Sequence, residues 1–411
     1  MIKKLILLSL TLLIGAAASA QTLKIATIAP EASDWMKGMR SGAREISERT
    51  EGRVTIKLYG GGVQGSDSQV LRKIRIGQLQ GGAFTPAVLT DTYKDIMLYN
   101  LPLVFDDQEE VDYIRERFDQ RLIKGLDDAG FVSFGFAATG FSVILSNDPV
   151  DSVDDLKNKK VWVPQGDPVS EAALKALGLN PTPLPLSDVF TGLQTRLIEI
   201  VPGSPIGALV LQWHTKVDYM TDLPLLYTAA LTAIDKRAFN RLRPGDQTVV
   251  TEVMTRLYKQ YDEKSAIDDI EAKQALLKSG VKRVVPDPEE AAEIRRIVLA
   301  SNHRLAEQGV FSLDLYEEML GHIADYRRLR ASLDVNAGEA VSTHATGNDC
   351  EGKEATAERL DTTETLAEKA AGDEADARGT RTEQAVASVV CANADQQDLE
   401  EQPTTTASGG D

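Results

Sequence analysis

The side chains that most often carry catalysis or hold metals are sparse in this sequence. It contains no Walker loop and neither of the motifs G-x-S-x-G and H-E-x-x-H. The histidines have no metal-ligand spacing and both cysteines lie near the end of the chain: His214, His303, His322, His344, Cys350 and Cys391. Without a nucleophile beside a general base, catalysis has little support. We therefore expect no catalytic residue, no metal, no cofactor and no enzyme activity.

One glycine-rich stretch matches a nucleotide-binding pattern only in part. Residues 60–65 read GGGVQG, which fits G-x-G-x-x-G between an expected strand and an expected helix. A dinucleotide site also needs an acidic residue about 20 positions further on, at the end of the next strand. Residues 79–87 contain none. We interpret the stretch as a tight turn at the start of a helix.

Aromatic residues near the ends of expected strands are a stronger sign of a binding site. Trp162 lies in the strand VWVP, Phe141 follows Gly140, and Trp213 and His214 follow a loop and a short helix. Each one alone is compatible with core packing, but apolar walls with a few polar groups are typical of small-molecule sites. The predicted ligand-binding residues are Trp35, Phe84, Thr85, Phe141, Ser142, Trp162, Gln165, Ser204, Trp213 and His214.

Residues 155–207 must position several of these side chains. The stretch alternates as strand, helix, strand, helix and strand, so that VWVPQ, PTPLP and IVPGSP end at one edge of a parallel sheet. Open parallel sheets bind ligands outside the carboxyl ends of their strands. Strands alternate with helices in the rest of the chain as well, which predicts an α/β fold.

The order of the elements predicts two interleaved lobes with a hinge and a cleft. The chain leaves the first sheet near residue 139, where Gly140 suits a crossing, and it returns near residues 220–240. We expect lobe I to hold residues 21–139 with a return segment of about 220–260. Lobe II is expected at 140–219, and the helices within 261–333 are expected to pack on both lobes.

The two ends of the chain differ from the rest in composition. Residues 1–20 combine a basic start, an apolar run and the sequence Ala18-Ser19-Ala20, which is typical of a signal peptide for export to the periplasm. Residues 334–411 have 18 Asp and Glu against 5 Lys and Arg, and no aromatic residue. This composition predicts a disordered acidic tail, with an acidic interaction segment as the alternative. The remainder is close to neutral, so nucleic acid is not an expected partner.

Several longer motifs occur within residues 22–332: YGGGVQGSDSQVLRKIRIGQLQGGAF, NLPLVFDD, GFAATGFSV, DSVDDLKNKKVWVP, ALGLNPTPLPLSDVFTGLQTRLIEIV and DKRAFNRL. Together they resemble the periplasmic solute receptors of TRAP transporters, the dicarboxylate-receptor (DctP-like) family. The resemblance implies two α/β lobes that close on one small solute and deliver it to an ion-coupled membrane permease. It also implies a carboxylate ligand, held by an arginine in the strand pattern K-x-R-V-P.

The sequence departs from this pattern at the positions that the resemblance assigns to the ligand. Trp162 stands in place of the anchoring arginine, Ser142 in place of a second arginine, and Gly203 at or near an asparagine position. A buried carboxylate without a cationic partner costs several kcal/mol. We therefore expect an apolar or uncharged ligand.

Other readings of the site stay open at this point. Arg196 could anchor an organic acid, Trp162 could hold a cationic ligand by a cation–π contact, and the chain could serve another import or sensing system. The replacements also resemble those in a TRAP subset that works with a periplasmic tetratricopeptide-repeat partner.

Overall fold

The computed structural model describes the backbone of residues 20–345 and the side chains as far as Ser332. The expected signal peptide and the part of the expected tail after Ala345, with Cys350 and Cys391, lie outside the described residues. Within them, ten strands form one sheet in the order β2-β1-β3-β9-β5-β8-β6-β7, and β4 and β10 pair with β9. None of the helices in this part of the chain is long and apolar enough to cross a membrane.

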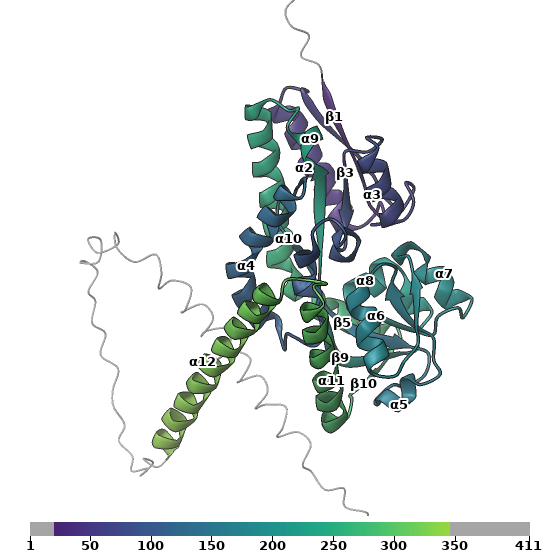
Figure 1. The fold of residues 1–411 in the computed structure, drawn as a ribbon, viewed down its shortest axis with the longest axis vertical. Helices are drawn as coiled ribbons and strands as arrows, with labels where there is room; N and C mark the ends of the chain where they lie inside the picture. Colours follow the sequence, from purple (N-terminus) through teal and green to yellow (C-terminus); the bar gives the residue numbers. More distant parts are fainter. Residues whose placement is uncertain (1–19, 346–411) are drawn as a thin grey trace, which may run out of the picture. The chain divides into compact units, whose positions relative to one another are not determined.

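Strands and helices alternate along the chain, as an α/β fold requires (Figure 1). The strands are β1 (Gln21–Ala26), β2 (Val54–Tyr59), β3 (Gly81–Phe84), β4 (Phe131–Val132), β5 (Ala137–Ser146), β6 (Val161–Pro164), β7 (Pro181–Leu184), β8 (Ile200–Gly203), β9 (Tyr219–Asp235) and β10 (Lys282–Val284). The α-helices are α2 (Asp34–Arg49), α3 (Asp67–Arg75), α4 (Gln108–Asp128), α5 (Val153–Leu156), α6 (Pro168–Ala176), α7 (Val189–Gln194), α8 (Pro205–Val210), α9 (Lys236–Phe239), α10 (Pro244–Lys278), α11 (Pro288–Glu307) and α12 (Leu313–Ala345). Short 3-10 helices are η1 (Pro86–Leu89), η2 (Lys94–Asn100), η3 (Leu186–Asp188) and η4 (Trp213–Thr215).

Lobe I is built on the parallel strands β1, β2 and β3, with β9 antiparallel to β3. One core of this lobe joins β1 to α2 and α10, and a second core joins β3 to α3, α4 and η2. The Ser33 hydroxyl caps α2 by accepting a hydrogen bond of 3.3 Å from the Met36 N–H. Met36 and Met39 then recur at helical spacing on the buried face. These layers place the carboxyl ends of three strands at one edge.

Lobe II is built on the parallel strands β6, β7 and β8, with β5 antiparallel to β8. Along the chain the elements run β6, α6, β7, α7 and β8, which confirms the alternation expected for residues 155–207. The first residue of α6 is Pro168 and that of α8 is Pro205, where the missing proline N–H costs nothing.

Two strands are shared by both lobes and form the hinge. β9 pairs with β3 near its carboxyl end and with β10 near its amino end. β5 pairs with β9 from Ala137 to Ser146, with irregularities between Ala138 and Gly140 and between Ser142 and Ile144. The sequence predicted two strands broken at Thr139 and Gly140. The ladder instead continues, because Gly140 takes a φ of 81° and absorbs the irregularity.

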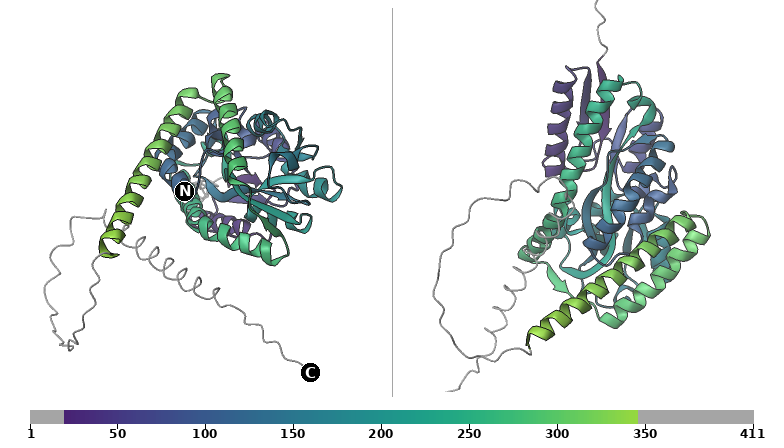
Figure 2. Two further views of the ribbon diagram at one scale, coloured as in Figure 1. Left: turned by 90° about the horizontal axis from the view of Figure 1, so that it is seen from below. Right: turned by 90° about the vertical axis from the view of Figure 1, so that its left-hand side faces the viewer.

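Helix α10 bridges the two lobes. It contacts α2 in lobe I, α8 in lobe II and the hinge strand β5. Figure 2 shows α10 beside α2 in its right-hand view.

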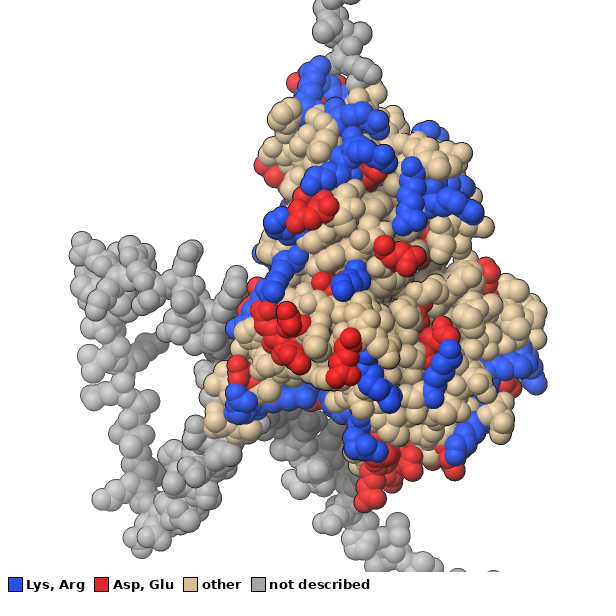
Figure 3. All heavy atoms as spheres, in the orientation of Figure 1, with Lys and Arg blue, Asp and Glu red and all other residues tan. Residues whose placement is uncertain are grey.

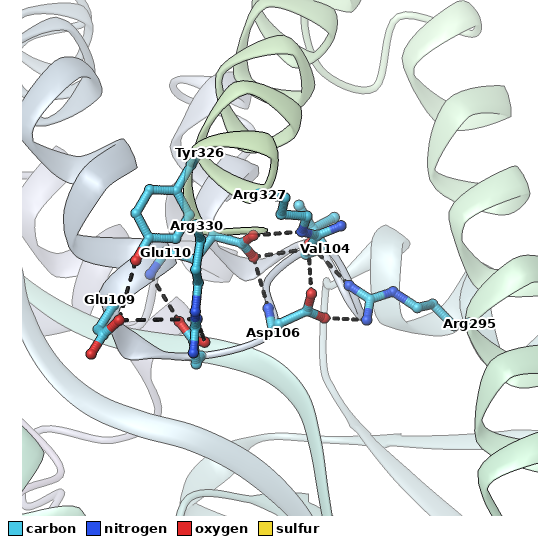
Figure 4. Close-up of polar contacts among 9 residues, drawn as sticks. Val104, Asp106, Glu109, Glu110, Arg295, Tyr326, Arg327 and Arg330 are labelled. Carbon is cyan, nitrogen blue, oxygen red and sulfur yellow. Dashed lines mark hydrogen bonds and ion pairs between the residues drawn. The ribbon is translucent and has the colours of Figure 1, made fainter. Parts of the chain in front are cut away.

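Helix α12 extends to Ala345, beyond the expected end of the last helix at Leu333. Its side chains bind the segment that starts α4 (Figure 4). The Arg327 guanidinium donates to both oxygens of Glu110, at 2.6 and 2.9 Å, and to the Val104 carbonyl at 3.0 Å. Glu110 is buried and also accepts from the Asp106 N–H at 2.8 Å. Nearby, the more exposed Arg330 pairs with Asp107.

This geometry predicts that Arg327→Ala costs far more stability than Arg330→Ala. Without Arg327 the buried Glu110 carboxylate loses its cation, whereas the Arg330 pair is open to water. We expect the free energy of unfolding to fall by about 2–3 kcal/mol for Arg327→Ala and by less than about 1 kcal/mol for Arg330→Ala. Urea denaturation measures both. Equal losses would contradict a buried anchor.

Candidate ligand site between the lobes

The parallel strands of each lobe end at an edge that carries loops of the candidate site. In lobe I, β1, β2 and β3 end at Ala26, Tyr59 and Phe84. A hollow of about 320 Å³ lies where the lobes meet, and Figure 3 shows the surface hollowed between the upper and lower parts of the molecule. The residues that line the hollow come from η1 and its following turn, from α6 and its preceding turn, and from the turn before α12: Thr90, Asp91, Gly166, Pro168, Glu171 and Val310.

The charged residues that line this hollow are acidic. Its lining includes the carboxylates of Asp91 and Glu171 but no lysine or arginine. Glu171 forms an ion pair with Lys175 at 2.5 Å, so the charge of this lysine is already balanced by a carboxylate. An anionic ligand would therefore find no lining cation, whereas an uncharged ligand needs none.

The amino end of α6, which borders the hollow, is already occupied by the chain's own carboxylate. Asp167 accepts hydrogen bonds from the N–H groups of Val169 and Ser170 at 3.0 and 3.1 Å, and from the Ser170 hydroxyl at 2.6 Å. Burial raises the pKa of Asp167, and the hydrogen bonds oppose this effect. A helix start with free N–H groups could bind an anion, but these donors are taken.

Trp162 and Trp213 lie together inside lobe II. Their rings meet edge to face with centroids 5.9 Å apart, and both side chains are buried. The Trp162 Nε1–H donates to the Leu184 carbonyl at 3.0 Å. A Cβ on Gly203 would lie 2.7 Å from the Trp213 ring, so the absent side chain makes room for this indole. The structure thus joins two of the departures from the family pattern, Trp162 and Gly203, through Trp213 into one packed unit.

The polar residues predicted in lobe II have identifiable partners. The Gln165 side chain is exposed beside Gly166 of the hollow, and the Gln165 N–H donates to the Leu184 carbonyl at 3.0 Å. The buried Ser204 hydroxyl caps α8 by accepting from the Gly207 N–H at 3.2 Å. Nδ1 of the half-buried His214 lies 3.1 Å from the Ala208 carbonyl. Of these, Gln165 is the side chain best placed to reach a ligand.

The remaining predicted residues are spread over the hinge and lobe I. Phe141 and Ser142 are buried in the hinge strand β5, where Phe141 packs edge to face on Tyr227 at 5.8 Å. Phe84 lies in a core of lobe I and Thr85 follows it, half-buried, at the end of β3. Trp35 packs 6.3 Å from Tyr261 of α10 in the other core. No single described cavity gathers all ten residues, and their ligand-binding role stays a prediction.

Arg196 does not lie at the edge where the lobe II strands end. Its carbonyl accepts a hydrogen bond of 3.0 Å from Lys160 Nζ, and Lys160 directly precedes β6. Both residues are therefore at the amino ends of β6 and β8. The carboxyl ends, which bear Gln165 and Ser204, lie at the opposite edge of the sheet.

One acidic residue near the lobe I edge escaped the sequence analysis. Asp67 is the first residue of α3, directly after the turn that follows β2. Burial raises the pKa of Asp67 from 3.8 to about 7. The only signal in the sequence was the glycine-rich turn, which predicted a helix start but gave no reason to expect burial.

A larger hollow of about 550 Å³ lies on lobe I, near the amino end of β3. It contains three cations, but two of them already have carboxylate partners. Lys236 pairs with Asp127 at 2.6 Å and Arg237 with Asp235 at 2.9 Å. Arg75 donates to the Thr92 hydroxyl at 3.2 Å. This hollow lies within one lobe, so it does not use the two-lobed arrangement.

Two lobes joined by shared strands, with strand ends beside an interlobe hollow, define a bilobal binding protein. Residues 25–308 match the family described as bacterial extracellular solute-binding protein, family 7 (DctP), and the chain belongs to this family. Over 202 residues it is 27% identical to the C4-dicarboxylate-binding periplasmic protein DctP of Rhodobacter capsulatus, which covers 48% of this chain and 60% of that protein.

Solved structures of TRAP periplasmic solute-binding proteins share the fold. The protein from Xanthobacter autotrophicus Py2 with bound β-D-galacturonate matches with a TM-score of 0.67 and 20% identity, over 73% of this chain and 98% of that one. The sugar acid binding protein DctPAm from Advenella mimigardefordensis, in complex with galactonate, matches with a TM-score of 0.69 and 20% identity, over 75% and 99%. These structures confirm the expected two-lobed α/β fold, and the match to the family model confirms the expected family.

The packing of Trp162 predicts a large effect on stability. Trp162→Ala removes a buried indole, its contact with Trp213 and its hydrogen bond to Leu184. We expect the free energy of unfolding to fall by about 3–5 kcal/mol, measured by urea denaturation. Lys160→Ala, two residues earlier and exposed, is the control and should change it by less than about 0.5 kcal/mol. A loss below about 1 kcal/mol for Trp162→Ala would mean that the indole does not support the core.

The raised pKa of Asp67 predicts a pH-dependent stability. Between the pKa of 3.8 in the unfolded chain and about 7 in the folded chain, the folded state binds more protons, so stability falls as pH rises through this window. Asp67→Asn removes the titrating group and should raise the free energy of unfolding by about 1 kcal/mol at pH 8 but little at pH 4. Thermal unfolding from pH 4 to 8 tests this, with Asp91→Asn as the exposed control. Parallel curves for wild type and Asp67→Asn would contradict it.

Proposed function

We propose that this chain is a periplasmic solute receptor that captures a small molecule between its lobes and delivers it to a TRAP-type permease. Membership in the family supports a solute-binding role. The observation that carries the proposal is the hollow lined by both lobes, beside strands that the two lobes share. A ligand in such a place is enclosed when the lobes rotate about their common strands.

The ligand that the side chains favour is uncharged. The names of solved relatives report acids: β-D-galacturonate, galactonate and succinate. Those ligands belong to those proteins and do not support an apolar ligand here. Support for an uncharged ligand comes from this chain's own residues: a hollow lined by two carboxylates and no cation, a capped α6, and a tryptophan pair. An organic acid bound through a non-standard anchor is the second candidate, favoured by the ligands of the relatives.

A comparison of matched probes tests the charge of the ligand. Native mass spectrometry of the protein purified from the periplasm first identifies any small molecule that co-purifies. Thermal shift then compares D-galacturonate with D-galactose and succinate with succinamide, pairs that differ mainly in charge. We expect any stabilisation to come from the uncharged members. Stabilisation by the acids alone would select the second candidate.

A substitution tests whether the interlobe hollow is the site. Gln165→Ala removes an exposed amide beside Gly166 and leaves the backbone bond to Leu184 in place. The loss of one hydrogen bond should weaken binding of the co-purified molecule about 5- to 10-fold. Isothermal titration calorimetry measures the affinity, and Gln194→Ala, an exposed change on α7, is the matched control. Equal affinity for both variants would remove Gln165 from the site.

A further inference from the structure

One face of α10 that carries acidic residues packs against the hinge strands. Asp262 and Asp269 lie seven residues apart, about two helical turns, so they share a face. Asp262 is bonded by the buried guanidinium of Arg115, which also donates to the Tyr227 hydroxyl at 3.0 Å. Tyr227 belongs to the hinge strand β9. Through Arg115, therefore, α10 and β9 are tied to α4 of lobe I.

Asp269 makes a different contact, with the crossing glycine itself. A Cβ on Gly140 would lie 2.4 Å from Asp269 Oδ1, so only glycine allows the carboxylate this close to the strand. Gly140 lies at one of the two irregularities of the β5–β9 ladder. Its carbonyl accepts from the Thr228 hydroxyl at 2.6 Å. Helix α10 thus touches the hinge at one of the two irregularities of the ladder.

The Asp269 carboxylate is incompletely bonded. Oδ1 is buried and has no hydrogen-bond partner among the described residues. Oδ2 lies 3.4 Å from Lys273 Nζ, which is also 3.8 Å from Asp222 of β9. Asp222 in turn pairs with Arg283 of β10 at 2.7 Å. Burial raises the pKa of Asp269, Lys273 lowers it and Asp222 raises it.

We infer that Asp269 is a positioning residue of the hinge, whose unpaired oxygen biases the balance between this arrangement of the lobes and a second one. A buried acceptor without a partner disfavours the conformation that contains it. Rotation of the lobes changes the backbone angles at hinge residues, so it moves Gly140 relative to α10 and gives Oδ1 access to water or to a donor. The inference concerns the empty protein and does not depend on the identity of the ligand.

The distance between the lobes in the ligand-free protein tests this inference. Spin labels at Arg72→Cys on α3 and Lys175→Cys on α6, both exposed, report that distance by pulsed electron paramagnetic resonance, with Cys350 and Cys391 replaced by serine. Asp269→Leu removes the unpaired oxygen and keeps a side chain of similar shape. We expect it to shift the ratio of populations about tenfold toward the distance of the present structure.

Asp268→Leu is the matched control, because Asp268 is the preceding residue, is more exposed than Asp269 and pairs with Lys264 at 2.6 Å. Its distance distribution should equal that of the unsubstituted protein. A distribution for Asp269→Leu that matches the control, or that shifts away from the present distance, overturns the inference.

A double-mutant cycle tests the contact separately. Gly140→Ala should lower the melting temperature, and Asp269→Ala in the same chain should recover part of that loss, because the new methyl group then has room. Strictly additive changes in melting temperature would mean that Gly140 and Asp269 do not touch, and the inference would fail.

Discussion

The antiparallel pairing of β5 with β9 is the constraint on which the rest of the structure depends. These two strands contribute to the sheets of both lobes, so backbone hydrogen bonds join the lobes throughout. Such a connection lets the lobes rotate but does not let them separate. The ladder has irregularities between Ala138 and Gly140 and between Ser142 and Ile144, and such irregularities bend a strand locally.

Two places in lobe II where a binding protein could hold an anion are filled by side chains of this chain itself. The start of α6 could have received an anion, but Asp167 occupies its donors. The strand β6 could have presented a charged side chain, but Trp162 turns into lobe II and packs on Trp213, in the space that Gly203 leaves free. These features are linked, since a side chain on Gly203 would displace Trp213, and without Trp213 the Trp162 ring would lose its neighbour.

Local patterns predicted much of the fold. Ser33 and Asp287 are residue types that favour the start of a helix, and their side chains cap α2 and α11. The order of strands and helices predicted two interleaved lobes. The continuity of β5 through Gly140 escaped prediction, because it depends on pairing with β9, about 90 residues away. The full length of α12 was not predicted either, because its residues 334–345 have the composition of the expected tail. For the candidate site, the sequence placed Trp162 within a strand and Gln165 directly after it, which is where the structure has them. It could not reveal which face of β6 receives Trp162 or that Asp67 is half-buried, because both depend on packing between distant segments.

The position of β9 in the sheet also bears on the order in which the chain folds. β9 lies between β3 and β5, yet it is made only after all of lobe II. The strand β3 therefore lacks one neighbour until β9 has paired with it, and that edge of β3 stays open until then. Lobe II, by contrast, has β6, β7 and β8 within one continuous stretch and needs fewer distant contacts. Since local contacts form fastest, the inserted lobe should fold before the lobe that precedes it in sequence.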